Sequence, residues 1–176
     1  MPKLRMLLLS AIVCALTACS GAVTRPDASS NYVYNGERFS AVKVDLTTQA
    51  QQQLSDNDTF QLDQLKTNLE TRLNADGLIS QGERYRVQVA VKDIRVRSTF
   101  SAVMWGFMAG DDHIQGDVTI FDAEDHPVHT FHVKASYALG GFAGGQDGMR
   151  MNWLYKRFAE LTSEEIRGGN KKQAKS

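Results

Sequence analysis

Residues that alternate between apolar and polar predict four β-strands along the chain. The first strand covers residues 41–46, the second begins at Tyr85, and the other two cover residues 114–120 and 131–139. In the second strand the apolar positions change from odd to even numbers near Asp93. Because side chains alternate strictly along a strand, this change of phase predicts a bulge at that point.

The connections between these strands differ in character. A short polar turn with a proline, residues 123–127, joins the last two strands and predicts an antiparallel hairpin. Residues 47–59 are rich in Gln, Thr and Asp, and we expect part of this stretch to be a loop.

Two stretches have the apolar spacing of an amphipathic helix. Leucines recur at intervals of three and four from Leu62 to Leu73, with Asp58 or Thr59 as a candidate N-cap. Gly77 follows this stretch and is suited to the left-handed residue that closes a helix. A second helix is predicted over residues 148–166, where Met, Leu, Tyr and Phe recur at helical spacing before two glycines.

The order of these elements indicates the fold class. One strand and one helix are followed by three strands and a final helix. Such a chain buries its apolar surfaces best when its helices pack on one face of a sheet. We therefore predict a single α+β domain over residues 39–167, with a mostly antiparallel sheet of about four strands and two amphipathic helices on one face.

The N-terminus has the pattern of a bacterial lipoprotein signal. A short basic start precedes an apolar run over residues 6–15, and the sequence Leu-Thr-Ala-Cys then ends at Cys19. The alternative is a transmembrane helix, but this run is shorter than the roughly 20 apolar residues that span a bilayer. We expect residues 1–18 to be a cleaved signal peptide and the thiol of Cys19 to carry lipid.

The residues after this cysteine extend the prediction to a location. Ser20, where an Asp would favour retention at the inner membrane, favours the outer membrane with the domain facing the periplasm. Residues 19–38 are rich in Ser, Gly and Asn, which indicates a flexible tether between the lipid and the domain. Residues 168–176 are basic and predict a disordered tail.

Charge and cysteine content exclude some classes of protein. Removing Lys3 and Arg5 from the 20 basic residues leaves 18 against 20 acidic ones, a formal net charge of −2 without basic clustering in the domain. A nucleic-acid binder would need a basic face, so we expect no nucleic-acid partner. Cys14 is lost with the signal and Cys19 carries lipid, so the mature domain has no internal disulfide.

Two segments match neither a strand nor a helix. Residues 100–110 are apolar where a connection between strands should be polar, and they include Met104, Trp105 and Phe107. They either pack as strand ends over the second helix or form an exposed lobe that docks on a partner or a bilayer. Residues 140–148 are rich in glycine around Phe142 and indicate a flexible strand-to-helix loop.

The order of the strands predicts that these two segments leave the sheet at the same end. We expect Met104, Trp105, Phe107 and Phe142 to be the contact residues of one docking surface.

The four histidines give little support to a metal or catalytic site. His129 and His132 differ by an odd number within one strand, so they point to opposite faces. A metal site needs three or four converging ligands, and we expect none. A hydrolase would need His113, His126 and nearby carboxylates to meet in one cleft.

Several segments together resemble a known family. They are the lipoprotein signal, the helix ending in LNADGLI, the strand YRVQVAVKDIRV, a connection rich in Gly and apolar residues, and GDVTIFDAEDHPVHTFHVKASYALGGFAGG. This pattern, in which a strand ends at Asp122 before a short turn, resembles the bacterial lipoprotein family of domain of unknown function 4410 (DUF4410) over roughly residues 40–166. The layout is also distantly similar to the periplasmic α/β module of curli-secretion and Lpo-type lipoproteins. The resemblance implies no catalytic residues.

The sequence therefore predicts a non-enzymatic outer-membrane lipoprotein without a cofactor, anchored through Cys19. Its expected role is to dock on an envelope protein through residues 100–110 and 140–148. The alternative is a periplasmic binder of a small apolar or glycan ligand, with a pocket lined by residues such as Tyr137 and Trp153.

Overall fold

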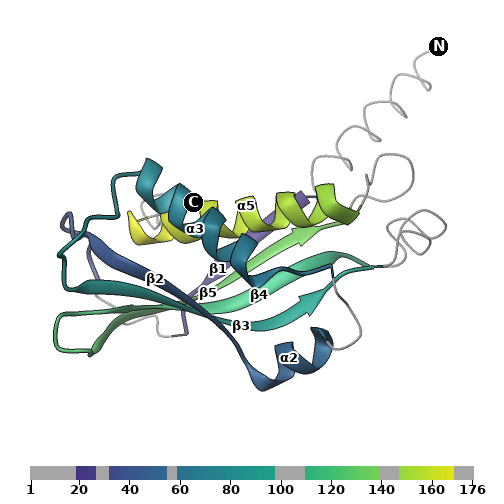
Figure 1. The fold of residues 1–176 in the computed structure, drawn as a ribbon, viewed down its shortest axis with the longest axis horizontal. Coiled ribbons are helices and arrows are strands. Elements are labelled where there is room, and N and C mark those ends of the chain that lie inside the picture. The colour runs from purple at the N-terminus through teal and green to yellow at the C-terminus, as the bar shows by residue number, and fades with distance from the viewer. Residues whose placement is uncertain (1–18, 27–31, 55–58, 98–109, 139–146, 169–176) are drawn as a thin grey trace, which may run out of the picture.

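The computed structural model describes residues 19–26, 32–54, 59–97, 110–138 and 147–168. They form a five-stranded sheet with the strand order β1-β5-β4-β3-β2 (Figure 1). The strands are β1 (Cys19–Thr24), β2 (Phe39–Leu46), β3 (Tyr85–Arg95), β4 (Asp112–Phe121) and β5 (Pro127–Tyr137). The helices are α2 (Thr48–Leu54), α3 (Leu62–Ala75) and α5 (Asp147–Ile166). None of the described helices is long and apolar enough to cross a membrane.

The α+β class and the mostly antiparallel sheet are confirmed. The pairs β1–β5, β5–β4 and β4–β3 are antiparallel, and β2–β3 is parallel. The parallel pair follows from α3, because a helix that connects two strands returns the chain to the end where the first strand began. The register between β3 and β4 shifts between Val91 and Asp93, so the predicted bulge is confirmed.

Alternation along the strands gives the sheet one apolar face. Val87, Val89 and Val91 of β3 are buried on this face, as are the matching residues of β4 and β5. The opposite face carries Gln, Asp, His and Lys side chains. Helices α3 and α5 both cover the apolar face, as predicted, whereas α2 lies on the other side of the sheet (Figure 1).

Local chemistry sets the ends of α3. Leu65, Leu69 and Leu73 are fully buried, which confirms the leucine stripe. Gly77 closes the helix with a φ of 71°, and the next residue, Leu78, donates a backbone hydrogen bond to Leu73 at 2.8 Å. The cap at the other end of α3 is Gln61, not Thr59, and Asp58 lies outside the described residues.

Helix α5 confirms the second predicted helix and completes the core. Met151, Leu154 and Phe158 lie buried against the sheet. The hydroxyl of Tyr155 accepts a hydrogen bond from the backbone N–H of Gln61 at 2.7 Å, which ties α5 to the start of α3. The two helices therefore form one layer over the sheet.

Two elements contradict the predicted boundaries. The expected tether over residues 19–38 is wrong for its first six residues, because Cys19–Thr24 form the edge strand β1 on β5. The stretch 47–59, where we expect a loop in part, contains the unpredicted helix α2. The Thr47 hydroxyl caps its first turn by accepting a hydrogen bond from the backbone N–H of Ala50. The sheet consequently has five strands instead of about four, and three helices accompany it in the described part of the chain.

Candidate docking end

The residues that flank the two unusual segments, 98–109 and 139–146, lie at one end of the sheet. Here Arg95 pairs with His113, and Asp112 pairs with Tyr137. The C-terminal ends of β3 and β5 therefore lie beside the N-terminal end of β4, close to the start of α5 (Figure 1). We call this region the loop end and define it by Arg97, Gly110, Asp112, Tyr137 and Asp147.

The described residues confirm that both segments leave the sheet at the same end. Residues 98–109 connect β3 to β4 and residues 139–146 connect β5 to α5, so all four attachment points belong to the loop end. The predicted contact residues within these segments lie outside the described residues. They are Met104, Trp105, Phe107 and Phe142.

A buried ion pair holds together the residues on either side of the segment 98–109. The guanidinium of Arg97 is 2% exposed and the carboxylate of Asp112 is 0% exposed. The backbone N–H of Arg97 donates to Asp112 Oδ1 at 2.6 Å, and Arg97 Nε donates to the same oxygen at 3.2 Å. Arg97 Nη1 also donates to the carbonyl of Gly110 at 2.7 Å and Nη2 to that of Tyr137 at 3.2 Å.

A second buried arginine joins this pair from α5. Arg150 Nε lies 3.3 Å from Asp112 Oδ2, and Nη2 donates to the carbonyl of Arg97 at 2.9 Å. Nη2 also donates to Asp147 Oδ1 at 2.5 Å. Among the described residues, Nη1 of Arg150 has no hydrogen-bond partner. Two buried guanidinium groups therefore share one fully buried carboxylate.

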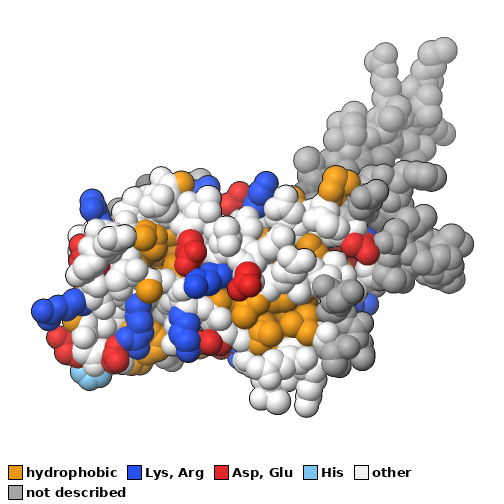
Figure 2. Space-filling model, in the orientation of Figure 1, with side chains coloured by type: hydrophobic (Ala, Val, Ile, Leu, Met, Phe, Trp, Pro, Cys, Tyr) orange, Lys and Arg blue, Asp and Glu red, His pale blue; other side chains and the backbone are white. Residues whose placement is uncertain are grey.

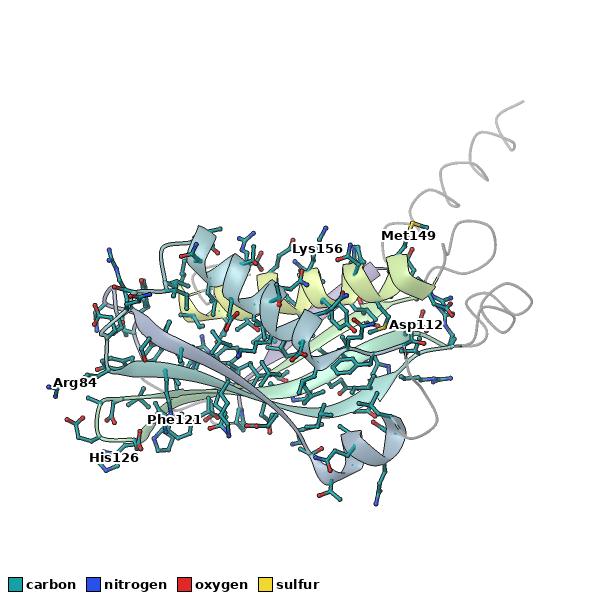
Figure 3. All side chains as sticks on the ribbon, viewed as in Figure 1. Arg84, Asp112, Phe121, His126, Met149 and Lys156 are labelled. Atoms are coloured by element: carbon teal, nitrogen blue, oxygen red, sulfur yellow. The ribbon has the colours of Figure 1, made fainter. Side chains whose placement is uncertain are left out.

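This arrangement fixes the positions of the attachment points relative to one another. A buried charge is tolerated only when partners replace its lost hydration, and here each partner comes from a different element. Asp112 belongs to β4, Arg97 follows β3, and Arg150 lies in the first turn of α5. The pairs consequently bind the three elements together at the points where the two segments attach (Figure 3 labels Asp112).

The exposed face of the sheet carries a separate group of polar side chains. His113 Nε2 lies 2.8 Å from Asp93 Oδ2, and His113 Nδ1 lies 3.3 Å from Asp111 Oδ1. Gln53 of α2 donates to Asp93 at 2.5 Å, and Ser136 donates to Asp111. These contacts hold α2 and the start of β4 in place on this face.

A second pair of this kind lies further along the same face. His132 Nδ1 lies 2.9 Å from Asp117 Oδ1, and Lys92 Nζ donates to Asp117 Oδ2 at 3.0 Å. His129, by contrast, is buried on the apolar face beside Phe131, so the prediction of opposite faces is confirmed.

These contacts lower the pKa of the carboxyl groups. Burial alone would raise the pKa of Asp93, but hydrogen bonds from Gln53 and His113 outweigh it, and the net pKa is below its usual value. The pKa of Asp111 is likewise lowered: burial raises it, but the hydrogen bond from Ser136 and the nearby His113 and Lys134 together outweigh burial. The carboxylates are therefore in their ionised form at neutral pH.

Within the part of the chain that the structure describes, the groups that a hydrolase would need do not converge. Ser136 donates to a carboxylate instead of to a histidine. His113 is near the start of β4, whereas His126 lies in the turn after β4, 3.6 Å from Asp122. The convergence of His113 and His126 that a hydrolase would need is not found, because the length of β4 separates them. No group of three metal-ligating side chains occurs within the described ranges.

The predicted ligand pocket can be compared with the cavities of the structure. Tyr137 and Trp153 contact each other edge to face, with ring centroids 5.3 Å apart. A groove of about 340 Å³ lies elsewhere, between the edge strand β2 and α3. It is lined by Ser40, Ala41, Val42, Glu70, Thr71, Asn74 and Ile79. These two aromatic residues are therefore not part of that groove.

Sequence reasoning located both segments but missed the charged residues at their attachment points. Asp112 has the same parity as Ile114 and Val118, and Arg150 lies one helical turn before Leu154. Both charged residues therefore occupy positions that face the core. A charged residue at a core position was the signal that could have identified this cluster.

Comparison with known proteins gives one family and several structures. No curated protein matches this chain. Among solved structures, the chain is similar to the PelC dodecamer from Paraburkholderia phytofirmans, with 12% identity, a TM-score of 0.47, and coverage of 84% of this chain and 97% of that chain. It is also similar to a minor lipoprotein from Acinetobacter baumannii, with 10% identity, a TM-score of 0.46, and coverage of 76% and 94%.

The family model described as "Domain of unknown function (DUF4410)" matches residues 19–141. This span differs from the resemblance expected over residues 40–166, because it includes β1 and leaves out α5. It begins at Cys19 and contains all five strands of the described sheet. Since the match covers well over half of the sequence, the chain belongs to the DUF4410 family.

Proposed function

We propose that this protein is a lipid-anchored envelope module that docks on a protein partner through residues 100–110 and 140–148, without catalysing a reaction. The lipid is carried by Cys19, and the domain faces the periplasm from the outer membrane. Met104, Trp105, Phe107 and Phe142 are the contact residues of the docking surface.

The observation that carries this proposal is that both segments are attached to the same end of the sheet. Both leave the loop end, and the buried Arg97–Asp112–Arg150 cluster holds their attachment points. Their sequences contain Phe, Met, Trp and Gly and, from 98 to 109 and from 139 to 146, no charged residue. Aromatic and Met side chains on a rigid base are typical of protein interfaces, since they bury a large apolar area at low cost in ordering.

Anchoring is tested by the state of Cys19. The full-length chain expressed in a Gram-negative host should yield a mature protein that begins at Cys19 and carries diacylglycerol, as measured by intact mass. Cys19→Ser should release the protein from the membrane fraction. A mature protein without lipid contradicts the anchor.

Docking is tested by changing one contact residue. Trp105→Asp should reduce the crosslinking of the partner in intact cells by about tenfold or more, since an interface hot spot contributes at least about 2 kcal/mol. Val128→Asp is the matched control, because Val128 is exposed at the opposite end of β5. The neighbour identified by mass spectrometry with the unchanged protein should persist with this control.

The stability of the variant decides between the two interpretations of residues 100–110. If Trp105→Asp folds with an unchanged melting temperature but loses the neighbour, the docking surface is supported. If it unfolds, the segment belongs to the core and the docking proposal is wrong.

A further inference from the structure

The predicted lipidation site is part of the sheet. Cys19 is the first residue of β1 and pairs with Tyr137 of β5, and Ser20 pairs with Ser136. Tyr137 in turn pairs with Asp112 on its other side. The backbone of Cys19 therefore lies at the loop end, with no free residue between it and the folded domain (Figure 1).

The length of the connection decides whether the domain has a fixed orientation on the membrane. A flexible tether of about 20 residues would have a root-mean-square length of roughly 25 Å and would let the domain turn freely. Since β1 starts at Cys19, that length is absent, and a lipid on this residue would hold the loop end beside the bilayer.

The chemistry of the loop end suits a bilayer surface. Met149, in the first turn of α5, is 63% exposed, so a large apolar side chain of this end is open to water. The charged groups of Arg97, Asp112 and Arg150 are turned inward and buried, whereas Asp147 is 36% exposed and pairs with Arg150. Removing this end from water would therefore bury an apolar side chain and would leave the three charges with the partners they already have.

The opposite end of the molecule exposes charged and polar side chains. Arg84 and His126 lie there, far from Met149 and Asp112 (Figure 3). The side chains of His126 and Asp125 are 75% and 69% exposed. Charged and polar groups that remain this exposed are suited to water.

We propose that the loop end rests on the lipid bilayer, with Met149 at the interface between water and lipid. This inference depends on the proposed lipid anchor and specifies the class of partner for the proposed docking surface. A protein partner of the docking surface would then be a protein embedded in the same membrane or bound to its surface.

The test compares one labelled position at each end. Because the lipidated Cys19 has no free thiol, Met149→Cys and Val128→Cys each provide a single site for an environment-sensitive fluorophore. Val128 is 37% exposed and lies nine positions before Tyr137 in β5, about 30 Å of extended chain. Both lipidated variants are reconstituted in vesicles of phosphatidylethanolamine and phosphatidylglycerol that contain spin-labelled lipid.

The spin label quenches only fluorophores close to the bilayer. We expect the fluorophore at position 149 to be quenched at least twofold more than the one at position 128. Equal quenching at both positions, or stronger quenching at position 128, contradicts the orientation. A protein that intact mass shows to carry no lipid contradicts the anchor instead, so the two failures are distinguishable.

Discussion

At the scale of single residues, the loop end depends on Asp112, the fully buried anion between Arg97 and Arg150. We expect Asp112→Asn to lower the free energy of unfolding by about 3–5 kcal/mol, because it leaves two buried guanidinium groups without their shared charge. Urea denaturation measures this loss.

The matched control for this change is Glu70→Gln on α3. Glu70 is 49% exposed and pairs with Lys66 at 3.8 Å, and an exposed pair of this kind contributes at most about 1 kcal/mol. If Asp112→Asn is no more destabilising than Glu70→Gln, the cluster does not stabilise the loop end.

Residue patterns predicted the core well and the buried charges poorly. The alternation of Val87, Val89 and Val91 located the buried face of β3, because a strand with one apolar face has a period of two. The same rule assigns Asp112 to the core face, but a pattern of residue types does not show whether a buried charge has partners. Those partners, Arg97 and Arg150, are 15 and 38 positions away in the sequence and become neighbours only through the fold.

At the scale of elements, the strands and helices with strong periodicity were predicted and those without it were missed. Helix α2 buries Ala50 alone and is otherwise rich in Gln, so it has no apolar stripe to detect. Strand β1 has the small and polar sequence CSGAVT, which resembles a tether. Its pairing with β5 comes from backbone hydrogen bonds, and these leave no mark on side-chain pattern.

The contribution of β1 can be measured by shortening the chain. We compare two variants without lipid. The longer one begins at Ser20, and the shorter one begins at Arg25, so it lacks β1 but retains the Arg25–Glu165 ion pair. In the shorter variant, amides of residues 132–137 that face β1 should exchange hydrogen about tenfold faster or more, because each lost backbone bond contributes about 1 kcal/mol.

The parallel pair β2–β3 provides the internal reference for that comparison. Its amides lie at the other edge of the sheet and should exchange equally in both variants. Unchanged protection of residues 132–137 would mean that β1 is not a stable strand in solution. The domain would then have the flexible tether that the sequence indicated, and its orientation on a membrane would be free.

At the scale of the whole molecule, the two ends of the sheet have different chemistry. The loop end carries the predicted lipidation site and the attachment points of two uncharged segments, and Arg97, Asp112 and Arg150 are buried there. The far end carries exposed charged side chains, which Figure 2 shows at the end away from the grey residues. The face of the sheet opposite α3 and α5 carries charged side chains that form ion pairs. The proposed anchor at one end would leave the charged end and the polar face in water.

Acid stability follows from the carboxyl groups of the molecule as a set. Each of those with a resolved shift in the described residues has a pKa below its usual value: Asp76, Asp93, Asp111, Asp117, Asp122 and Glu165. A carboxyl whose pKa is lower in the folded state stabilises the fold above its unfolded pKa, near 4. This stabilisation is lost as pH falls through the folded value.

We therefore expect the urea midpoint to be constant near neutral pH and to fall between about pH 5 and about pH 3. Asp93→Asn should lower the midpoint at pH 7, because it removes the charge that His113 and Gln53 contact. It should also reduce the loss on acidification, since one of the groups that must take up a proton is gone. A midpoint that stays the same down to pH 3 would show that these carboxylates are no better stabilised in the folded protein than in the unfolded chain.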